Sequence, residues 1–212
     1  MQKIIRIGTR DSQLAVWQAS LVQKLLKDWG YDSVLVYIKT EGDTDLVTPL
    51  YELGVQGIFT RSLDAALLND RIDMAVHSMK DVPVQLAKGI TQAAVLKRGS
   101  HKDLLVLHPR QATVKTKYTV ESISTTKAGS KEKATKWLLH LNEHPEKAGE
   151  PEDVVIATSS IRRISQWLNR FPNNKIENLR GNVNTRLKKL SESNWHGAIF
   201  AAAGLERIGL RP

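Results

Sequence analysis

An acid and a base stand side by side where an apolar run of the chain ends. The stretch "DMAVHSMKDVPV", residues 73–84, has the composition of a buried strand that stops at Lys80 and Asp81, with Pro83 two places further on. A carboxylate at such a position can stabilise a cation that develops during a reaction, or accept hydrogen bonds from N–H groups of a ligand. The pair could also be a turn that carries a surface ion pair, and this pattern alone leaves both interpretations open.

Cationic side chains follow other expected strands in the same way. They are Arg10 after residues 4–9, Arg162 and Arg163 after 154–157, Arg180 after 176–179, and Arg207 after 199–204. In open α/β sheets ligands bind outside the carboxyl ends of the strands, where helix N-termini also favour anions. Because guanidinium groups bind carboxylates in a bidentate way, the sequence predicts a ligand with several acidic groups. At some stage this ligand develops a positive charge or presents N–H groups to Asp81.

These positions also have plainer interpretations. Arg162 and Arg163 could belong to a solvated helix face, and Ser12, Thr158 and Ser160 could simply cap helices. His77 is expected to be packed or hydrogen-bonded at a strand end rather than to shuttle protons. The functional hypothesis therefore depends on the coincidence that five strand ends carry such residues.

Strands and helices that could position these residues alternate along the chain. The sequence predicts strands over 3–9, 33–40, 72–78, 103–108, 153–158, 175–179 and 197–203, and helices over 11–30, 60–71, 159–171 and 183–193. Such alternation is typical of parallel sheets that helices cover on both faces. We expect two doubly wound α/β lobes: an N-terminal domain over 1–108, and a second domain over 109–212 that carries a polar insertion at about 109–152.

Apolar spacing predicts which helix faces point inward. The expected inner face of the helix over 11–30 consists of Leu14, Trp17, Leu21 and Leu25; Asp11 or Ser12 would cap this helix and Gly30 would end it. The expected inner face of the helix over 159–171 consists of Ile161, Ile164 and Leu168, and Trp167 also has the spacing of a core residue. Within the insertion, "KATKWLLHL", residues 133–141, is expected to form a short helix.

Composition narrows the class of protein. The 212 residues are 41% hydrophobic and 25% charged, as in an ordinary globular protein, and no run approaches the roughly 18 apolar residues of a membrane span. With no apolar leader recognised, we expect a cytoplasmic protein that binds no membrane. The net charge of +9 suggests anionic partners, but only 6% of residues are aromatic, which favours small polyanions over nucleic acid.

Metal and thiol chemistry receive little support. The chain has no cysteine, which excludes disulfides, thiolate nucleophiles and cysteine-ligated metals within it. "HLNEH", residues 140–144, matches a short zinc-protease pattern, but it lies in the insertion and Pro145 follows it at once. We therefore expect no metal site.

Six segments resemble the signature segments of the porphobilinogen deaminase (hydroxymethylbilane synthase) family. They are "GTRDSQLAVWQA", "GIFTRSLDAALL", "DMAVHSMKDVP", "TSSIRRISQ", "LRGNVNTRLKKL" and "AAAGLERIGL", and the match extends from residue 4 to the end of the chain apart from the insertion. The resemblance implies two lobes of the periplasmic-binding-protein type and a monomer. It also implies condensation of four porphobilinogen molecules into hydroxymethylbilane, with loss of ammonia.

The resemblance also assigns roles to individual residues. Asp81 matches the catalytic aspartate of the family, with Lys80 beside it, and Phe59 looks like the aromatic residue that covers the active site. The arginines that match those holding substrate and cofactor carboxylates are Arg10, Arg162, Arg163, Arg180, Arg186 and Arg207, with Lys80, Ser12, Ser78, Thr158 and Ser160 as supporting donors.

The chain departs from the family pattern in several places. Gln56 replaces a usual lysine, Asn184 a usual glycine, and "TEGD" at 40–43 the commoner "TRGD". The family implies a dipyrromethane cofactor held through a thioether to a cysteine in a third small domain, whereas this chain ends at Pro212 without any cysteine. We expect a truncated form or a fragment of a longer protein. The alternative is a non-catalytic anion-binding module of two lobes.

Overall fold

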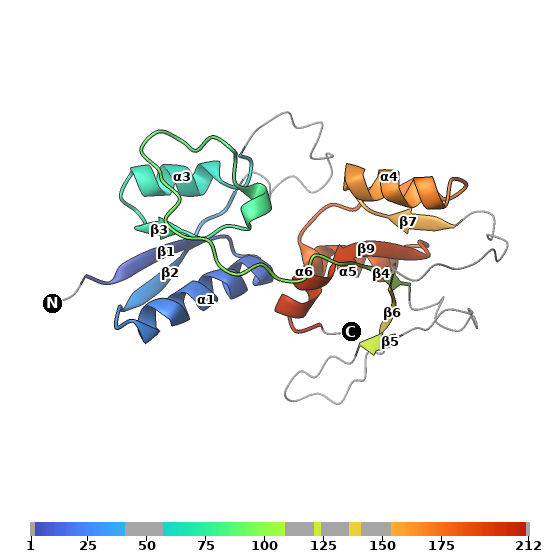
Figure 1. Cartoon of the computed structure of the whole chain (residues 1–212), viewed down its shortest axis with the longest axis horizontal. Helices are drawn as coiled ribbons and strands as arrows, with labels where there is room; N and C mark the ends of the chain where they lie inside the picture. Colours follow the sequence, from blue (N-terminus) through green and yellow to red (C-terminus); the bar gives the residue numbers. More distant parts are fainter. Residues whose placement is uncertain (1–2, 41–56, 109–120, 124–135, 141–153, 211–212) are drawn as a thin grey trace. The chain divides into compact units, whose positions relative to one another are not determined.

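The chain forms two compact units, Met1–Lys97 and Arg98–Pro212. The structure, a computed structural model, describes residues 3–40, 57–108, 121–123, 136–140 and 154–210 (Figure 1). The division falls before the expected domain boundary at 108. This is because β4 (Asp103–Leu107) pairs along its whole length with β9 (Gly197–Ala201) in the sheet of the second unit.

The first unit is built on a parallel sheet of three described strands. β1 (Ile5–Thr9) lies between β2 (Ser33–Tyr37) and the short β3 (Met74–Ala75). Figure 1 shows α1 (Gln13–Asp28) and α3 (Arg61–Leu68) on opposite sides of these strands, as a doubly wound fold requires. α3 contributes Leu63 and Ala66 to the core, where they pack with Ile38 and Ile72. The α/β class predicted for this region is confirmed.

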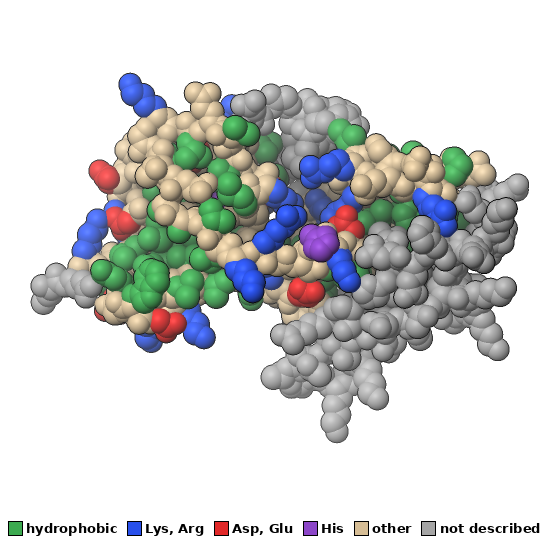
Figure 2. Space-filling view, in the orientation of Figure 1, with side chains coloured by type: hydrophobic (Ala, Val, Ile, Leu, Met, Phe, Trp, Pro, Cys, Tyr) green, Lys and Arg blue, Asp and Glu red, His purple; other side chains and the backbone are tan. Residues whose placement is uncertain are grey.

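α1 begins where the sequence predicts but faces differently. Ser12 is the cap residue, because its Oγ accepts a hydrogen bond from Ala15 N at 3.4 Å, and Gly30 beyond the helix end has φ +84°. The core position expected for Trp17 is wrong: this side chain is 39% exposed, while Ala19 is fully buried. Residues two apart on a helix point roughly 200° away from each other, so burying Ala19 turns Trp17 outward. Figure 2 shows a group of apolar side chains on the visible face of the first unit.

The second unit contains a mixed sheet in the order β5-β6-β4-β9-β7-β8. The remaining strands are β5 (Glu121–Ile123), β6 (Lys136–His140), β7 (Val155–Ala157) and β8 (Lys175–Glu177). β9, β7 and β8 run parallel, whereas β4, β5 and β6 join by antiparallel pairing, so the expectation of purely parallel sheets fails for this unit.

Helices cover both faces of this sheet. They are α4 (Ile161–Arg170) on one face, and α5 (Val183–Glu192) and α6 (Ala202–Arg207) on the other (Figure 1). Because successive strand residues point to opposite faces, Leu104 and Val106 pack with the α5 and α6 side, and Leu105 packs with Trp167 of α4. Among the helices that the structure describes, none is long and apolar enough to cross a membrane.

Two further expectations for the second unit are wrong. Residues 136–140 form strand β6 rather than a helix, because pairing with β4 gives this apolar run a ladder of backbone hydrogen bonds. Ile161 is 57% exposed instead of inward, and Trp167, at 9% exposure, is the α4 side chain that fills the core. The rest of the expected insertion, 109–120, 124–135 and 141–152, lies outside the described residues.

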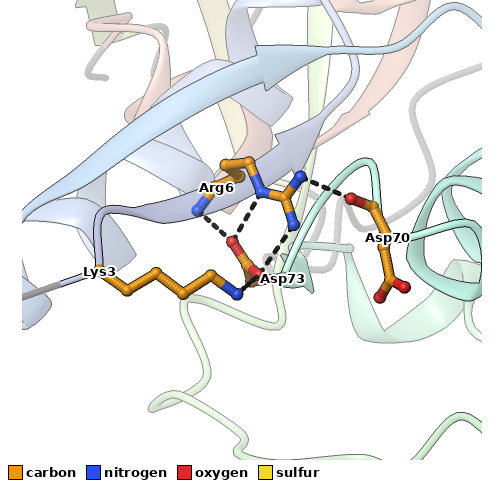
Figure 3. Close-up of polar contacts among 4 residues, drawn as sticks. All are labelled: Lys3, Arg6, Asp70 and Asp73. Carbon is orange, nitrogen blue, oxygen red and sulfur yellow. Dashed lines mark hydrogen bonds and ion pairs between the residues drawn. The ribbon is translucent and has the colours of Figure 1, made fainter.

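An ion cluster joins β1 to the start of β3 (Figure 3). The Arg6 guanidinium donates to both Asp73 oxygens, from Nε at 2.9 Å and Nη2 at 3.0 Å, and Arg6 N donates to Oδ2 at 2.8 Å. Lys3 Nζ adds a bond to Oδ1 at 2.6 Å, and Arg6 Nη1 donates to Asp70 O. The Arg6 and Lys3 hydrogen bonds hold the pKa of Asp73 well below its ordinary value.

Replacing Asp73 should therefore lower stability in a pH-dependent way. A carboxyl whose pKa is depressed by folding stabilises the protein above its unfolded pKa of about 3.9, and this contribution is lost as the pH falls further. We expect Asp73→Asn to lower Tm by a few degrees at pH 7, with the difference from wild type shrinking below pH 4. Thermal melts across this pH range measure it. Asp32→Asn, an exposed carboxylate with no ion pair among the described residues, is the control; equal losses in both variants would contradict the assignment.

Candidate functional site

The acid and base of the 73–84 stretch lie at the carboxyl edge of the first sheet. Arg10 follows β1 directly, and the 3-10 turn η1 (Met79–Asp81) comes shortly after β3; both loops leave the same edge because β1 and β3 are adjacent and parallel. Asp81 N donates to Ser78 O at 2.9 Å, which closes the turn. Asp81 is partly buried and Lys80 is exposed. The two side chains thus differ in their access to water.

Phe59 and Arg10 are in direct contact. The Arg10 guanidinium carbon lies 4.2 Å from the centroid of the Phe59 ring, within the range of a cation–π interaction. The contact joins the residue that follows β1 to the segment that precedes α3. Gly57 begins the turn that presents Phe59; its φ is +75°, and an added Cβ would lie 2.9 Å from Thr60 Oγ1.

The pKa of His77 depends on its burial and on the charged groups around it. Burial lowers the pKa of His77 below its ordinary value; the carboxylates of Asp64 and Asp81 oppose the shift, and the Arg10 guanidinium adds to it. His77 is therefore neutral at neutral pH. Asp81 and Arg10 both influence this imidazole, as expected for groups that follow the adjacent parallel strands β3 and β1.

The hydroxyl donors predicted in the first unit have partners within the fold. Ser12 Oγ caps α1, as described above, and keeps its own O–H for another acceptor. Ser78 Oγ donates to Gln18 Oε1 of α1 at 3.1 Å. Gln18 was not predicted from the sequence, because nothing in the pattern of a helix links it to a turn sixty residues later.

In the second unit, predicted site residues lie in the loops and helices that follow its parallel strands. Thr158 follows β7, and Arg180 follows β8; they are only 2% and 3% exposed. Arg207 lies in the last turn of α6, which follows β9. Its guanidinium lies against Gly99, because a Cβ added to this glycine would be 3.1 Å from Arg207 Nη2. Arg186 of α5 donates from Nε to Gly181 O at 2.7 Å, which ties it to the loop that carries Arg180.

The start of α4 carries three further predicted residues. Ser160 is its cap residue but forms no side-chain cap bond; instead Ser160 N donates to Thr158 Oγ1 at 3.3 Å. Arg162 is exposed on the helix surface. Arg163 is partly buried and forms an ion pair with Asp103, with Nη2 to Oδ1 at 2.6 Å.

Ser159 is a residue of this region that sequence reasoning missed. Its Oγ accepts from Leu179 N at 3.0 Å and donates to Leu179 O at 2.5 Å, so one hydroxyl ties the end of β7 to the residue before Arg180. Three successive hydroxyl residues at 158–160 are visible in the sequence. Which of them points to the neighbouring strand depends on the sheet pairing and could not be predicted.

Ser159→Ala should cost more stability than the same change at Ser160. It leaves the backbone N–H and C=O of the buried Leu179 without their partner, a loss of about 1–3 kcal/mol. Ser160→Ala removes no side-chain cap bond and should change stability by no more than about 0.5 kcal/mol. Urea unfolding of the two variants measures the difference. A similar loss in both would show that Ser159 is not the clamp.

No metal site emerges from the part of the chain that the structure describes. No group of three or more His, Asp or Glu side chains is placed to hold a metal ion there. In the "HLNEH" pattern, His140 is the last residue of strand β6, and 141–144 lie outside the described residues. Gln56 also lies outside them, whereas Asn184 is exposed on α5.

Comparison with known proteins connects these residues to a family. A family model described as "Porphobilinogen deaminase, dipyromethane cofactor binding domain" matches residues 5–212. The chain belongs to the porphobilinogen deaminase family. It is 41% identical over 210 residues to the porphobilinogen deaminase of Legionella pneumophila (strain Paris), 38% over 207 to the probable porphobilinogen deaminase of Methanocaldococcus jannaschii, and 37% over 210 to that of Methylobacillus flagellatus.

The match covers nearly all of this chain but only part of each relative. It takes in 98% of the chain, and 57%, 59% and 57% of these three porphobilinogen deaminases. The matched family model is the one for dipyrromethane binding, and the 212 residues contain no cysteine. The family resemblance and the α/β class expected from the sequence are both confirmed.

Proposed function

We propose that this chain carries the catalytic and carboxylate-binding residues of a hydroxymethylbilane synthase. Such an enzyme condenses four porphobilinogen molecules head to tail, consumes one molecule of water, which supplies the terminal hydroxyl, releases four molecules of ammonia and forms linear hydroxymethylbilane. The observation that carries the proposal is the grouping of Asp81, Arg10 and Phe59 at one edge of the first sheet in a member of the porphobilinogen deaminase family. A plain carboxylate binder has no need of an acid at that edge.

Asp81 is the proposed catalytic residue. When the C–N bond of the aminomethyl group breaks, the electron pair leaves with ammonia and a cationic azafulvene remains. A fixed carboxylate lowers the free energy of this cation and can accept a hydrogen bond from the pyrrole N–H. Lys80, adjacent and exposed, is placed to meet a substrate carboxylate while Asp81 meets the positive end.

Arginines are the proposed ligands of the acidic side chains. Each pyrrole bears an acetate and a propionate, so the growing chain is a polyanion, and bidentate guanidinium contacts suit its carboxylates. The proposed set is Arg10, Arg162, Arg163, Arg180, Arg186 and Arg207, with Ser12, Ser78, Thr158 and Ser160 as further donors and Phe59 as the cover of the site. The alternation of cationic groups with hydroxyls supports a ligand of several carboxylates.

These residues fit the acidic groups of dipyrromethane, which, when bound, supplies the primer for condensation. Guanidinium and hydroxyl groups are donors that suit carboxylate acceptors, which favours this assignment. The fit does not extend to covalent attachment, because the 212 residues supply no cysteine sulfur.

We further propose that the protein is a cytoplasmic monomer. Size-exclusion chromatography with light scattering would check the oligomeric state, and cell fractionation would check the location.

The decisive experiment replaces the matched 210 residues of the Legionella relative by this chain. The chimera should consume porphobilinogen and release hydroxymethylbilane, followed as uroporphyrin after acid and oxidation. The intact mass and the aldehyde-reagent colour test report bound dipyrromethane. The Legionella protein is the positive control. A folded chimera that carries dipyrromethane but leaves porphobilinogen unchanged would refute the proposal. So would a chimera that binds porphobilinogen but does not convert it.

A further inference from the structure

Asp103 supplies a carboxylate at an edge of the second sheet where cations gather. It is the first residue of β4 and pairs with Ala201 at the end of β9. Because β4 runs antiparallel to β9, the start of β4 lies at the carboxyl end of β9 and of its parallel neighbour β7. Asp103, at the start of β4, therefore lies beside the start of α4, which follows β7.

Arg163 is held by three hydrogen bonds at this place. Its Nε donates to Asp103 Oδ2 at 2.8 Å, its Nη2 to Asp103 Oδ1 at 2.6 Å, and its Nη1 to Ile199 O at 3.3 Å. The side chains of Arg163 and Asp103 are 19% and 32% exposed, so water screens the pair only in part. The guanidinium plane is fixed by contacts to two different strands.

The count of donors leaves room for a ligand. A guanidinium has five N–H groups, and three of them are used in these bonds. The two others, on Nη1 and Nη2, have no partner among the described residues, and a carboxylate could accept both. We propose that Asp103 is a positioning residue, which orients Arg163 so that these two donors meet a carboxylate of the ligand. The proposal rests on the proposed function for the identity of that ligand.

Charge and geometry make opposite predictions for Asp103. If Asp103 were only a nearby negative charge, its removal would strengthen binding of an anion. If it orients Arg163, its removal frees a guanidinium that must then be ordered again on binding, and affinity falls. We expect Asp103→Asn to weaken binding by about fivefold to tenfold although it makes the protein more positive.

Binding titrations of the full chain test this prediction. The probes are porphobilinogen and, separately, citrate, at constant ionic strength and well below the Tm of each variant. Asp73→Asn is the matched control: it removes the same charge from another bidentate Asp–Arg pair, in the first unit and outside the site. It should bind both probes as wild type does. Arg163→Lys, which keeps the charge but loses the bidentate geometry, should bind as weakly as Asp103→Asn.

Each outcome decides the matter. The inference is overturned if Asp103→Asn binds the probes as tightly as wild type or more tightly. It is also overturned if Arg163→Lys binds them as tightly as wild type, and this second result decides the question if Asp103→Asn fails to fold. If wild type binds citrate but not porphobilinogen, the proposed function fails, while the citrate affinities still test Asp103. If wild type binds neither probe, Arg163 presents no carboxylate site in this chain and the inference is overturned as well.

Discussion

Asp81→Asn is expected to reduce porphobilinogen turnover by about 10²–10⁴-fold, the range that a positioned carboxylate contributes to such a step. The asparagine has almost the same shape but cannot neutralise the azafulvene cation. Binding of porphobilinogen should persist, because the carboxylates of the substrate are assigned to arginines. The loss should therefore appear in kcat rather than in binding, measured by single-turnover kinetics in the chimera with the Legionella relative.

The control for this prediction is Asp64→Asn. Asp64 lies on α3 and acts on the same imidazole of His77 as Asp81 does, so its replacement removes one negative charge from the same neighbourhood. It should change turnover only a few-fold. If the two variants lose turnover equally, the effect is one of general electrostatics and Asp81 has no special position in the reaction.

Gly181→Ala is expected to destabilise the second unit by about 2–4 kcal/mol, the sum of left-handed strain and overpacking. Gly181 has φ +109°, and an added Cβ would lie 2.7 Å from Thr185 Cγ2 and 2.8 Å from Thr185 Cβ. Thr185 has little freedom to move, because its N and Oγ1 both donate to Asn182 Oδ1, at 2.9 and 3.1 Å. Urea unfolding followed by circular dichroism measures the loss.

Gly209→Ala separates the two causes of that loss. Gly209 belongs to the same unit and has φ +83°, but an added Cβ would meet nothing within 4 Å. This variant should cost only the strain, about 1–2 kcal/mol. Equal losses at the two positions would mean that Thr185 gives way to the added methyl group and that overpacking contributes nothing.

Much of the fold could be predicted because local patterns decided it. The first strand was predicted over 3–9 and is found at Ile5–Thr9. Ser12 was correctly predicted as a candidate helix cap, since an N-cap needs only a hydroxyl and the amides that follow it. Trp17 and Ile161 were misjudged because apolar spacing identifies a stripe on a helix but not which part of the stripe meets the sheet. For 136–140, pairing with β4 outweighed the short helical pattern.

The sequence by itself determined the family, the α/β alternation and the strands that Asp81, Arg10 and Arg180 follow; Arg207 lies at the end of helix α6 instead. Those features depend on residue types within short segments. Only the tertiary structure decided that Phe59 contacts Arg10, that Ser159 hydrogen-bonds Leu179, and that Asp103 pairs with Arg163. The physical reason is separation along the chain: Arg163 and Asp103 are 60 residues apart, and they meet because β4 pairs antiparallel with β9, a choice that no local pattern contains.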